Sequence, residues 1–308
     1  MCIRDRLKAK PEKTVFVSGI GCAARLPYYL STYGFHTIHG RAPAVATGVK
    51  LTNPELDVWV ATGDGDGLSI GGNHMLHALR RNIDLQILLF NNEIYGLTKG
   101  QYSPTSRAGT VSPSTPMGSV ERPVKPAEFA LGAGARFVAR GIDTQQKRLV
   151  PLLKRSHQHR GASFVVIYQN CVVYNNGAFS HFTDKKNAAN WQLHVEHGKP
   201  LLFGKDKQRG LRLKPGCMGL EVVDVSDKGV SVDEVLVHDE TNRALAMQLA
   251  SLEPPQSPIA LGVLFCDPRE PYDTSVHDQI VQAEADATEQ DLAALLREGQ
   301  TWVVGEED

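Results

Sequence analysis

The feature that most constrains this chain is a pair of polar clusters, each placed directly after a short apolar run. Gly63-Asp64-Gly65-Asp66 follows the run 57–62, and Asn91-Asn92 follows the run 85–90. Continuous apolar runs of this length are typical of buried parallel strands. The residues between the two runs, 72–81, have the apolar spacing of a helix. The segment therefore predicts one strand-helix-strand unit.

The two clusters are expected to meet at one edge of the sheet. A right-handed crossover places the strands side by side or nearly so, and Asp64 and Asn92 then emerge at the carboxyl edge, where ligands of open α/β sheets bind. A carboxylate, an amide oxygen and backbone carbonyls suit Mg²⁺, which also contacts substrate phosphates. Gly63 and Gly65 let the backbone approach a diphosphate, and amides at the next helix start can donate to it. A GDG turn alone would more commonly be ordinary turn chemistry, and the paired asparagines shift that balance.

Longer stretches around these clusters resemble a known family. They are GDGDGLSIGGNH at 63–74, LFNNEIYGLTKGQYSPT at 89–105, and HGRA and AVATG at 39–42 and 44–48. These stretches are similar to the thiamine diphosphate-binding β subunits of 2-oxoacid:ferredoxin oxidoreductases, nearest to 2-oxoglutarate synthase, and the similarity runs from about residue 15 to residue 239. The resemblance implies an α/β fold, with an open, mostly parallel sheet, helices on both faces, and a smaller irregular C-terminal region.

The resemblance also implies particular site residues. Asp64, the side chain of Asn92 and the carbonyl of Ile94 match the family's Mg²⁺ ligands. The remaining cofactor-binding residues that we predict are Gly63, Gly65, Asp66 and Arg41, and the residues predicted to act in catalysis are Lys99 and His39. By position alone, Lys99 is equally a solvated loop lysine, and a histidine at a strand end is commonly just hydrogen-bonded. His74 and His77 have metal-like spacing, but no cysteine or acidic partner nearby completes a zinc set.

The five cysteines are sparse and odd in number, which argues against a disulfide framework and for a reducing compartment. The resemblance implies that Cys22 and Cys171 are two of four ligands of a [4Fe-4S] cluster, whereas the residues alone favour buried small hydrophobes. The family's other two ligands lie in an amino-terminal Cys-x-x-Cys, and this chain contains no such motif. The chain as written is therefore expected to bind a cluster poorly. Cys217 and Cys266 are predicted to be packing residues.

The first residues are expected to be foreign to the protein. The opening MCIRDR is similar to sequence found at the ends of fragmentary gene models, so we predict that residues 1–13 are non-native or disordered and that the natural amino terminus is missing. The formal net charge of -1 offers no electrostatic case for nucleic acid or an anionic membrane. No apolar run approaches the length that spans a bilayer, and no secretory signal is readable, so we predict a cytoplasmic protein.

The remaining map is coarser. We predict a diphosphate-binding domain over 14–178 and a C-terminal extension over 179–308 that makes subunit contacts. A polar loop over 102–126 is too long to be idle, so it is predicted to cover the cofactor or meet a partner subunit. The further predicted elements are strands at 12–18, 136–139, 163–168, 221–225 and 259–265, and helices at 42–51, 126–133, 144–159 and 278–297.

The family resemblance implies oxidative decarboxylation of 2-oxoglutarate to succinyl-CoA, with coenzyme A as acyl acceptor and electrons passed through the cluster to ferredoxin. The glutamate that activates the cofactor would lie on a partner α subunit or a fused γα subunit, so the chain is expected to be inactive alone. Three alternatives stay open: a broader 2-oxoacid range including pyruvate and branched-chain acids, a non-redox thiamine diphosphate decarboxylase or synthase, and a non-catalytic assembly subunit.

Overall fold

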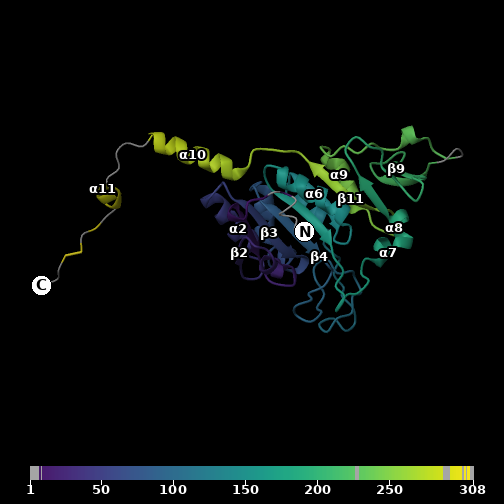
Figure 1. Cartoon of the computed structure of the whole chain (residues 1–308), viewed down its shortest axis with the longest axis horizontal. Helices are drawn as coiled ribbons and strands as arrows, with labels where there is room; N and C mark the ends of the chain where they lie inside the picture. Colours follow the sequence, from purple (N-terminus) through teal and green to yellow (C-terminus); the bar gives the residue numbers. More distant parts are fainter. Residues whose placement is uncertain are drawn as a thin grey trace.

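The computed structural model describes residues 7, 9–225, 229–286, 292–299, 302, 304 and 305. The predicted fold class is confirmed, because an open and mostly parallel sheet carries helices on both faces (Figure 1). The strand order is β2-β1-β3-β4-β6-β5-β11-β7. These strands are β1 (Thr14–Ser18), β2 (Tyr33–His36), β3 (Asp57–Gly63), β4 (Gln86–Asn91), β5 (Phe137–Ile142), β6 (Ser163–Tyr168), β7 (Gln192–Val195) and β11 (Ile259–Cys266).

The predicted strand-helix-strand unit is present. Strands β3 and β4 pair in parallel, with Gly63 opposite Phe90, and α4 (Gly72–Arg80) connects them. Strand β3 is buried along its interior because its residues are apolar on both faces, as a central strand covered on two sides requires. Both polar clusters therefore leave the sheet at the same edge, on neighbouring strands.

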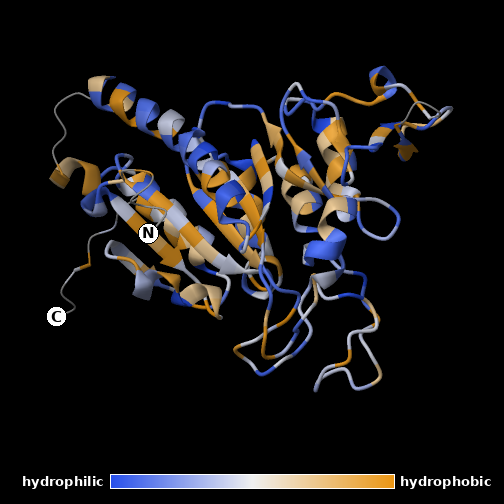
Figure 2. Cartoon of the chain, turned by 45° about the vertical axis from the view of Figure 1, so that its right-hand side comes forward, coloured by the Kyte–Doolittle hydropathy of each residue, from blue (hydrophilic) through white to orange (hydrophobic). Residues whose placement is uncertain are grey.

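Two helical layers cover the sheet. One face packs against α2 (Ala42–Thr52), α4, α5 (Pro126–Gly132) and α9 (Arg243–Ser251), and its core includes the fully buried Leu79. The other face packs against α6 (Gln146–Gln158) and the 3-10 helix η2 (Ala23–Tyr29), with Leu153 fully buried there. Figure 2 shows the hydrophobic central strands enclosed between these layers. Fully burying one such leucine side chain contributes roughly 1.5–3 kcal/mol.

Several element boundaries differ from the predictions. The first strand begins at Thr14, because a short 3-10 helix with a proline at its start (Pro11–Lys13) precedes it. Strand β5 continues to Ile142, three residues past the predicted end at 139, because it pairs with β6 along its whole length. The remaining short helices are α3 (Asp64–Leu68), α7 (Ser180–Thr183), α8 (Lys185–Trp191) and the 3-10 helix η3 (Val232–Glu234).

The prediction of a smaller irregular C-terminal region needs correction. Strands β7 and β11 both join the large sheet, where β11 pairs antiparallel with β5 and parallel with β7. Part of the segment after residue 178 therefore belongs to the same core, which sequence distance concealed. The separate part is a small antiparallel sheet of β8 (Leu202–Phe203), β9 (Arg209–Leu213) and β10 (Leu220–Asp224), which lies at one end of the molecule (Figure 1).

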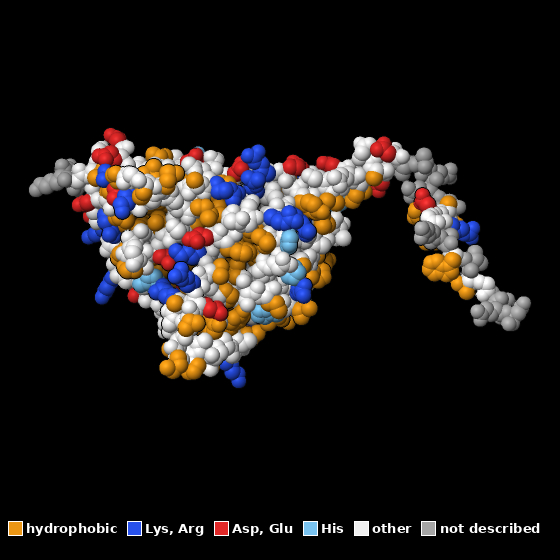
Figure 3. Space-filling model, turned by 180° about the vertical axis from the view of Figure 1, so that it is seen from behind, with side chains coloured by type: hydrophobic (Ala, Val, Ile, Leu, Met, Phe, Trp, Pro, Cys, Tyr) orange, Lys and Arg blue, Asp and Glu red, His pale blue; other side chains and the backbone are white. Residues whose placement is uncertain are grey.

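The predicted amphipathic helix over 278–297 also needs correction. Helix α10 runs from Tyr272 to Asp286 and α11 from Leu292 to Leu296, and residues 287–291 lie outside the described residues. Asp273 is the buried residue of α10, and most of the helix projects from the body as an arm (Figure 3). Within the described ranges, no helix is both long and apolar enough to cross a membrane. Of the predicted non-native start, 1–13, residues 1–6 and 8 lie outside the described residues.

Candidate cofactor site

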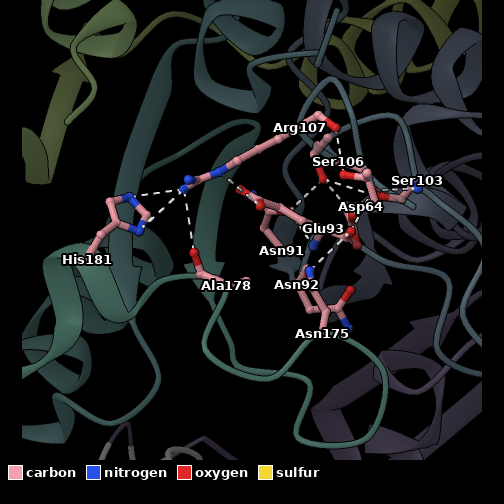
Figure 4. A network of polar contacts seen from close by, with 12 residues as sticks. Asp64, Asn91, Asn92, Glu93, Ser103, Ser106, Arg107, Asn175, Ala178 and His181 are labelled. Carbon is pink, nitrogen blue, oxygen red and sulfur yellow. Dashed lines mark hydrogen bonds and ion pairs between the residues drawn. The ribbon is translucent and has the colours of Figure 1, made fainter. Parts of the chain in front are cut away.

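Asp64 is the first residue of α3, directly after β3, and its side chain is buried. Two hydroxyl groups donate to its Oδ2 atom, Ser103 Oγ at 2.5 Å and Thr105 Oγ1 at 2.6 Å. The backbone amide of Asn92 also donates to this carboxylate. The two polar clusters thus meet, as predicted, and a third segment of the chain joins them (Figure 4).

The electrostatics at Asp64 suit a cation. Burial raises the pKa of the Asp64 carboxyl, and the hydrogen bonds from Ser103 and Thr105 oppose that effect. Burial of a carboxylate is costly unless an opposite charge or hydrogen bonds compensate. A divalent cation at this carboxylate would favour its charged form.

The three predicted metal ligands line one cavity. Asp64, Asn92 and Ile94 all contribute to its wall, together with Gly63 and Gly65. Asn92 Oδ1 accepts from the Ile94 amide at 3.2 Å, which folds the chain back after β4. A carboxylate, an amide oxygen and a backbone carbonyl are therefore brought together, and this donor set is of the kind that Mg²⁺ accepts.

Gly65 is required by a close approach. A Cβ atom on Gly65 would lie 2.2 Å from the Tyr95 ring, and the Tyr95 hydroxyl donates to the Gly65 carbonyl at 3.0 Å. The ring of Tyr95 therefore packs directly on the backbone of the GDG segment. This contact fixes α3 against the loop that follows β4.

Asp66, another predicted cofactor-binding residue, also lines the cavity, where the protein holds its carboxylate. Its Oδ1 accepts from the backbone amides of Ile20 at 3.1 Å and Gly40 at 2.7 Å, and its Oδ2 accepts from Thr62 Oγ1 at 2.6 Å. Protein donors therefore engage both oxygens of this buried carboxylate. Asp66 ties the ends of β1 and β3 to the start of α2, because the three segments meet at its side chain.

The other predicted residues lie at different distances from the cavity. His39 lines it, with its ring centroid 6.1 Å from that of Tyr95. Arg41 is exposed, and its Nη1 lies 2.7 Å from Nε2 of His74. Lys99 is exposed, one residue beyond Thr98 in the cavity wall, and its backbone adopts φ +74°. The structure therefore joins His39 to the site and leaves Arg41 and Lys99 outside its wall.

A histidine metal site receives no support. His74 faces Arg41, and Nδ1 of His77 accepts from Arg80 Nε at 2.9 Å. Among the residues that the structure describes, no group of three or more His, Cys, Asp or Glu side chains could hold a metal ion. The predicted magnesium ligands do not form such a group, because two of them are an amide oxygen and a backbone carbonyl.

The two candidate cluster ligands converge. Cys22 and Cys171 are far apart in sequence, yet a Cβ atom on Gly96 would lie 3.4 Å from the first sulfur and 3.7 Å from the second. A Cβ atom at position 96 would therefore contact both sulfurs at ordinary van der Waals distances. Two thiolates on one side of a glycine fit two corners of an iron–sulfur cluster. Cys266 is half-buried, whereas Cys217 is exposed, so the prediction that Cys217 is a packing residue is wrong.

Sequence reasoning missed the residues that hold the predicted metal ligands and the neighbouring Glu93 in place. Besides Ser103 and Thr105, Ser106 donates to the Glu93 carbonyl at 2.5 Å and Asn175 donates to the Asn92 carbonyl at 3.0 Å. Burial raises the pKa of Glu93 to about 7. The run of hydroxyl residues in QYSPTS, directly after the loop of the second cluster, was the available signal.

The comparisons with known proteins agree with this geometry. A family model described as "Thiamine pyrophosphate enzyme, C-terminal TPP binding domain" matches residues 19–167. The chain is 48% identical to the 2-oxoglutarate oxidoreductase subunit KorB of Mycobacterium tuberculosis, over 97% of this chain and 80% of that protein. The chain belongs to the β subunits of the 2-oxoacid:ferredoxin oxidoreductases.

Two further proteins are similar to this chain, one over part of its length and one over nearly all of it. The 2-oxoglutarate synthase subunit KorB of Methanocaldococcus jannaschii is 44% identical over 55% of this chain and 63% of its own length. The solved 2-oxoglutarate:ferredoxin oxidoreductase of Magnetococcus marinus, with 2-oxoglutarate, coenzyme A and succinyl-CoA bound, superposes with a TM-score of 0.74. That structure shares 30% identity and covers 97% of this chain and 87% of its own. Because the relatives are oxidoreductases, the non-redox alternative is set aside.

Proposed function

We propose that this chain is the thiamine diphosphate-binding β subunit of a 2-oxoglutarate:ferredoxin oxidoreductase. The complete enzyme would convert 2-oxoglutarate and coenzyme A to succinyl-CoA and CO₂ and would pass the electrons to ferredoxin. The observation that carries this proposal is the 48% identity to the mycobacterial subunit along almost the whole chain. The convergence of Asp64 and Asn92 at the edge of the sheet supports it independently.

The proposed site divides its work between side chains and backbone. Asp64, the amide oxygen of Asn92 and the carbonyl of Ile94 would hold Mg²⁺. The backbone of Gly63 and Gly65 would allow the diphosphate close to the chain. When bound, thiamine diphosphate supplies the carbanion chemistry, and the protein contributes binding, orientation and electrostatics.

The remaining predicted residues have roles that follow from their places. His39 would contact the cofactor or substrate from the cavity wall. Lys99 and Arg41 are exposed, so each would reach substrate only if a partner subunit or a loop closure brought it inward. Cys22 and Cys171 would ligate the cluster in a protein that also supplies the other two thiolates.

Partner chains complete the proposal. An α subunit, or a fused γα subunit, would supply the groups that activate the cofactor, and ferredoxin would accept the electrons. The polar loop over 102–125 has exposed apolar residues at its tip, Val111, Met117 and Val120, which suit such a contact. In Figure 3 this tip of the molecule shows hydrophobic side chains.

Calorimetry of thiamine diphosphate binding tests the site. The chain mixed with its α partner is titrated with and without Mg²⁺, in wild-type form and as Asp64→Ala. We expect magnesium-dependent binding that disappears in Asp64→Ala, because the carboxylate is the only charged ligand of the proposed set. Asp206→Ala, which removes an exposed carboxylate beside the small sheet, is the matched control and should bind as wild type does. Equal binding by Asp64→Ala would refute the assignment.

Activity of the reconstituted pair then tests the reaction. We expect viologen reduction that depends on both 2-oxoglutarate and coenzyme A, with slower reduction from pyruvate or branched-chain 2-oxoacids. Comparable rates with all of these acids would favour a broad-range enzyme. Cofactor binding without any reduction would favour the assembly subunit.

A further inference from the structure

A second cavity lies behind the cofactor site. It has a volume of about 180 Å³ and is lined by Asn91, Glu93, Thr105, Arg107, Pro123, Val124, Lys125, Pro126, Arg140, Tyr168, Phe179, His181, Phe182, Glu253, Pro254 and Ile259. Thr105 separates the two sites, since its hydroxyl donates to Asp64 on one side and its side chain lines this cavity on the other. Figure 4 shows the polar residues that run from Asp64 through Arg107 to His181.

Arg140 is the unusual residue of this cavity. It lies in the middle of β5, between Val138 and Ile142, which belong to the core that α5 and α9 cover. Its Nη2 donates to the Ala250 carbonyl of α9 at 2.5 Å, so the side chain points to this face of the sheet. The residue is 3% exposed, and among the residues that the structure describes its Nε and Nη1 atoms have no hydrogen-bond partner.

Such a guanidinium needs a counterion. A buried charge without a partner is strongly unfavourable, and an unsatisfied buried donor adds to that cost. Within the described part of the chain Arg140 forms no ion pair. The other cations of the cavity are already compensated, because Arg107 faces Glu93 at 3.6 Å and Lys125 faces Glu253 at 3.4 Å. The cavity therefore has a positive charge left over, and an anion would neutralise it.

The rest of the wall indicates what kind of anion would fit. Tyr168, Phe179 and Phe182 form an aromatic cluster, with Tyr168 centroids 5.0 Å and 5.4 Å from the two phenylalanine rings. Pro126 and Ile259 extend this apolar surface. A volume of 180 Å³ corresponds to about six water molecules, which is larger than a bare inorganic ion requires. A ligand with one carboxylate and a short carbon chain matches both the cation and the apolar wall.

We propose that this cavity, which we call the Arg140 cavity, binds a small organic carboxylate. The carboxylate group supplies acceptors for the unpartnered nitrogens of Arg140. The carbon chain packs on Tyr168, Phe179 and Phe182, and Arg107 and His181 line the same cavity. Arg–carboxylate hydrogen bonds are among the stronger ones in proteins, which is why Arg140 would dominate the affinity.

Calorimetry with butyrate as the probe tests this proposal on the full chain without thiamine diphosphate, so its outcome is separate from that of the cofactor site. We expect saturable binding by the wild type, and binding at least about tenfold weaker in Arg140→Met, which keeps the length of the side chain but removes its charge. Arg160→Met, which changes an exposed arginine, is the matched control and should bind butyrate as wild type does.

Three results would overturn the proposal: no binding by the wild type, equal binding by Arg140→Met, or equally tight binding of sulfate at matched ionic strength, which would make the site one for inorganic anions. If Arg140→Met does not fold, His181→Trp is measured instead, because the larger side chain would fill part of the cavity. Loss of butyrate binding in that variant supports the proposal, and unchanged binding contradicts it.

Discussion

At the scale of single residues, the site depends on side chains that would not contact the cofactor themselves. Ser103 and Thr105 hold the same oxygen of Asp64, and the single proton of the Thr105 hydroxyl is shared between that oxygen and Asn91 Oδ1 at 2.8 Å. One hydroxyl thus connects the carboxylate of the first polar cluster to the amide of the second. Mutation of groups that orient a metal ligand in this way typically lowers metal affinity by about 10–100-fold.

Thr105→Val should weaken magnesium-dependent thiamine diphosphate binding by roughly 10–100-fold, because the variant keeps the shape of the side chain and removes both hydrogen bonds. Thr105→Ser retains the hydroxyl and should stay close to wild type. Thr110→Val is the matched control, since it changes a threonine of the same loop that donates to the Arg107 carbonyl, away from Asp64. Calorimetry with the α partner present measures all three, and wild-type affinity in Thr105→Val would refute the positioning role.

Gly65→Ala should destabilise the protein by about 1–3 kcal/mol, because its methyl group would overlap the Tyr95 ring. Gly72→Ala is the contrasting variant. It adds the same methyl group where nothing lies within 4 Å, at the start of α4, so it should be neutral or stabilising by up to about 1 kcal/mol. Urea unfolding gives both values. Equal free energies of unfolding for the two variants would show that the Tyr95 ring moves aside without destabilising the protein.

At the scale of elements, α6 contacts the sheet through a titratable side chain, His157. The His157 ring stacks on Trp59 of β3 with centroids 5.8 Å apart, and its Nε2 lies 3.2 Å from the Asp57 carboxylate. The Asp57 carboxylate at this distance raises the pKa of His157, and partial burial opposes it. The stability that this pair contributes is fully present below the unfolded-state pKa of about 6.5. It is lost as the pH rises through the raised folded-state pKa.

Asp57→Asn should therefore lower the free energy of unfolding most at about pH 5.5, where His157 is charged in both states, and least at about pH 8.5. Urea unfolding across this range measures the difference from wild type. Asp206→Asn removes a carboxylate that no histidine contacts in the described structure, and its difference from wild type should not follow the same curve. An Asp57→Asn difference that grew with pH would contradict the assignment.

At the scale of the whole molecule, the loop over 102–125 has a buried side and an exposed tip. Its inner residues, Ser103 and Thr105, are buried against Asp64, while Met117 and Val120 at its tip are 96% and 94% exposed. Exposed apolar groups of this size on a projecting loop are typical of a contact surface. The loop therefore connects the proposed metal site directly to the surface that a partner subunit would cover.

Met117→Glu combined with Val120→Glu should reduce co-purification with the α subunit, because two charges would have to be desolvated in the contact. Thiamine diphosphate affinity of the mixture should fall in parallel. Met218→Glu changes a methionine that is 81% exposed near the small antiparallel sheet, and it should leave co-purification unchanged. Undiminished pairing of the double variant would place the partner on another surface.

The sequence by itself determined the parts of this protein that depend on local pattern. Apolar runs at 57–62 and 85–90 predicted β3 and β4 within one residue at either end, because strands buried on both faces need continuous apolar residues. Strand 163–168 was predicted at its observed ends. The meeting of Asp64 with Asn92 followed from the same rule, since neighbouring parallel strands end at one edge.

Only the tertiary structure decided what depends on contacts distant in sequence. It placed β7 and β11 in the large sheet and turned Ser103 and Thr105 toward Asp64. It made Asp66 the point at which the ends of β1 and β3 meet the start of α2. It also brought Cys22 and Cys171 to one side of Gly96, and it left Nε and Nη1 of Arg140 without a hydrogen-bond partner among the described residues. None of these leaves a periodic signal, because each is set by packing and hydrogen bonding between segments whose order in the chain does not reveal that they touch.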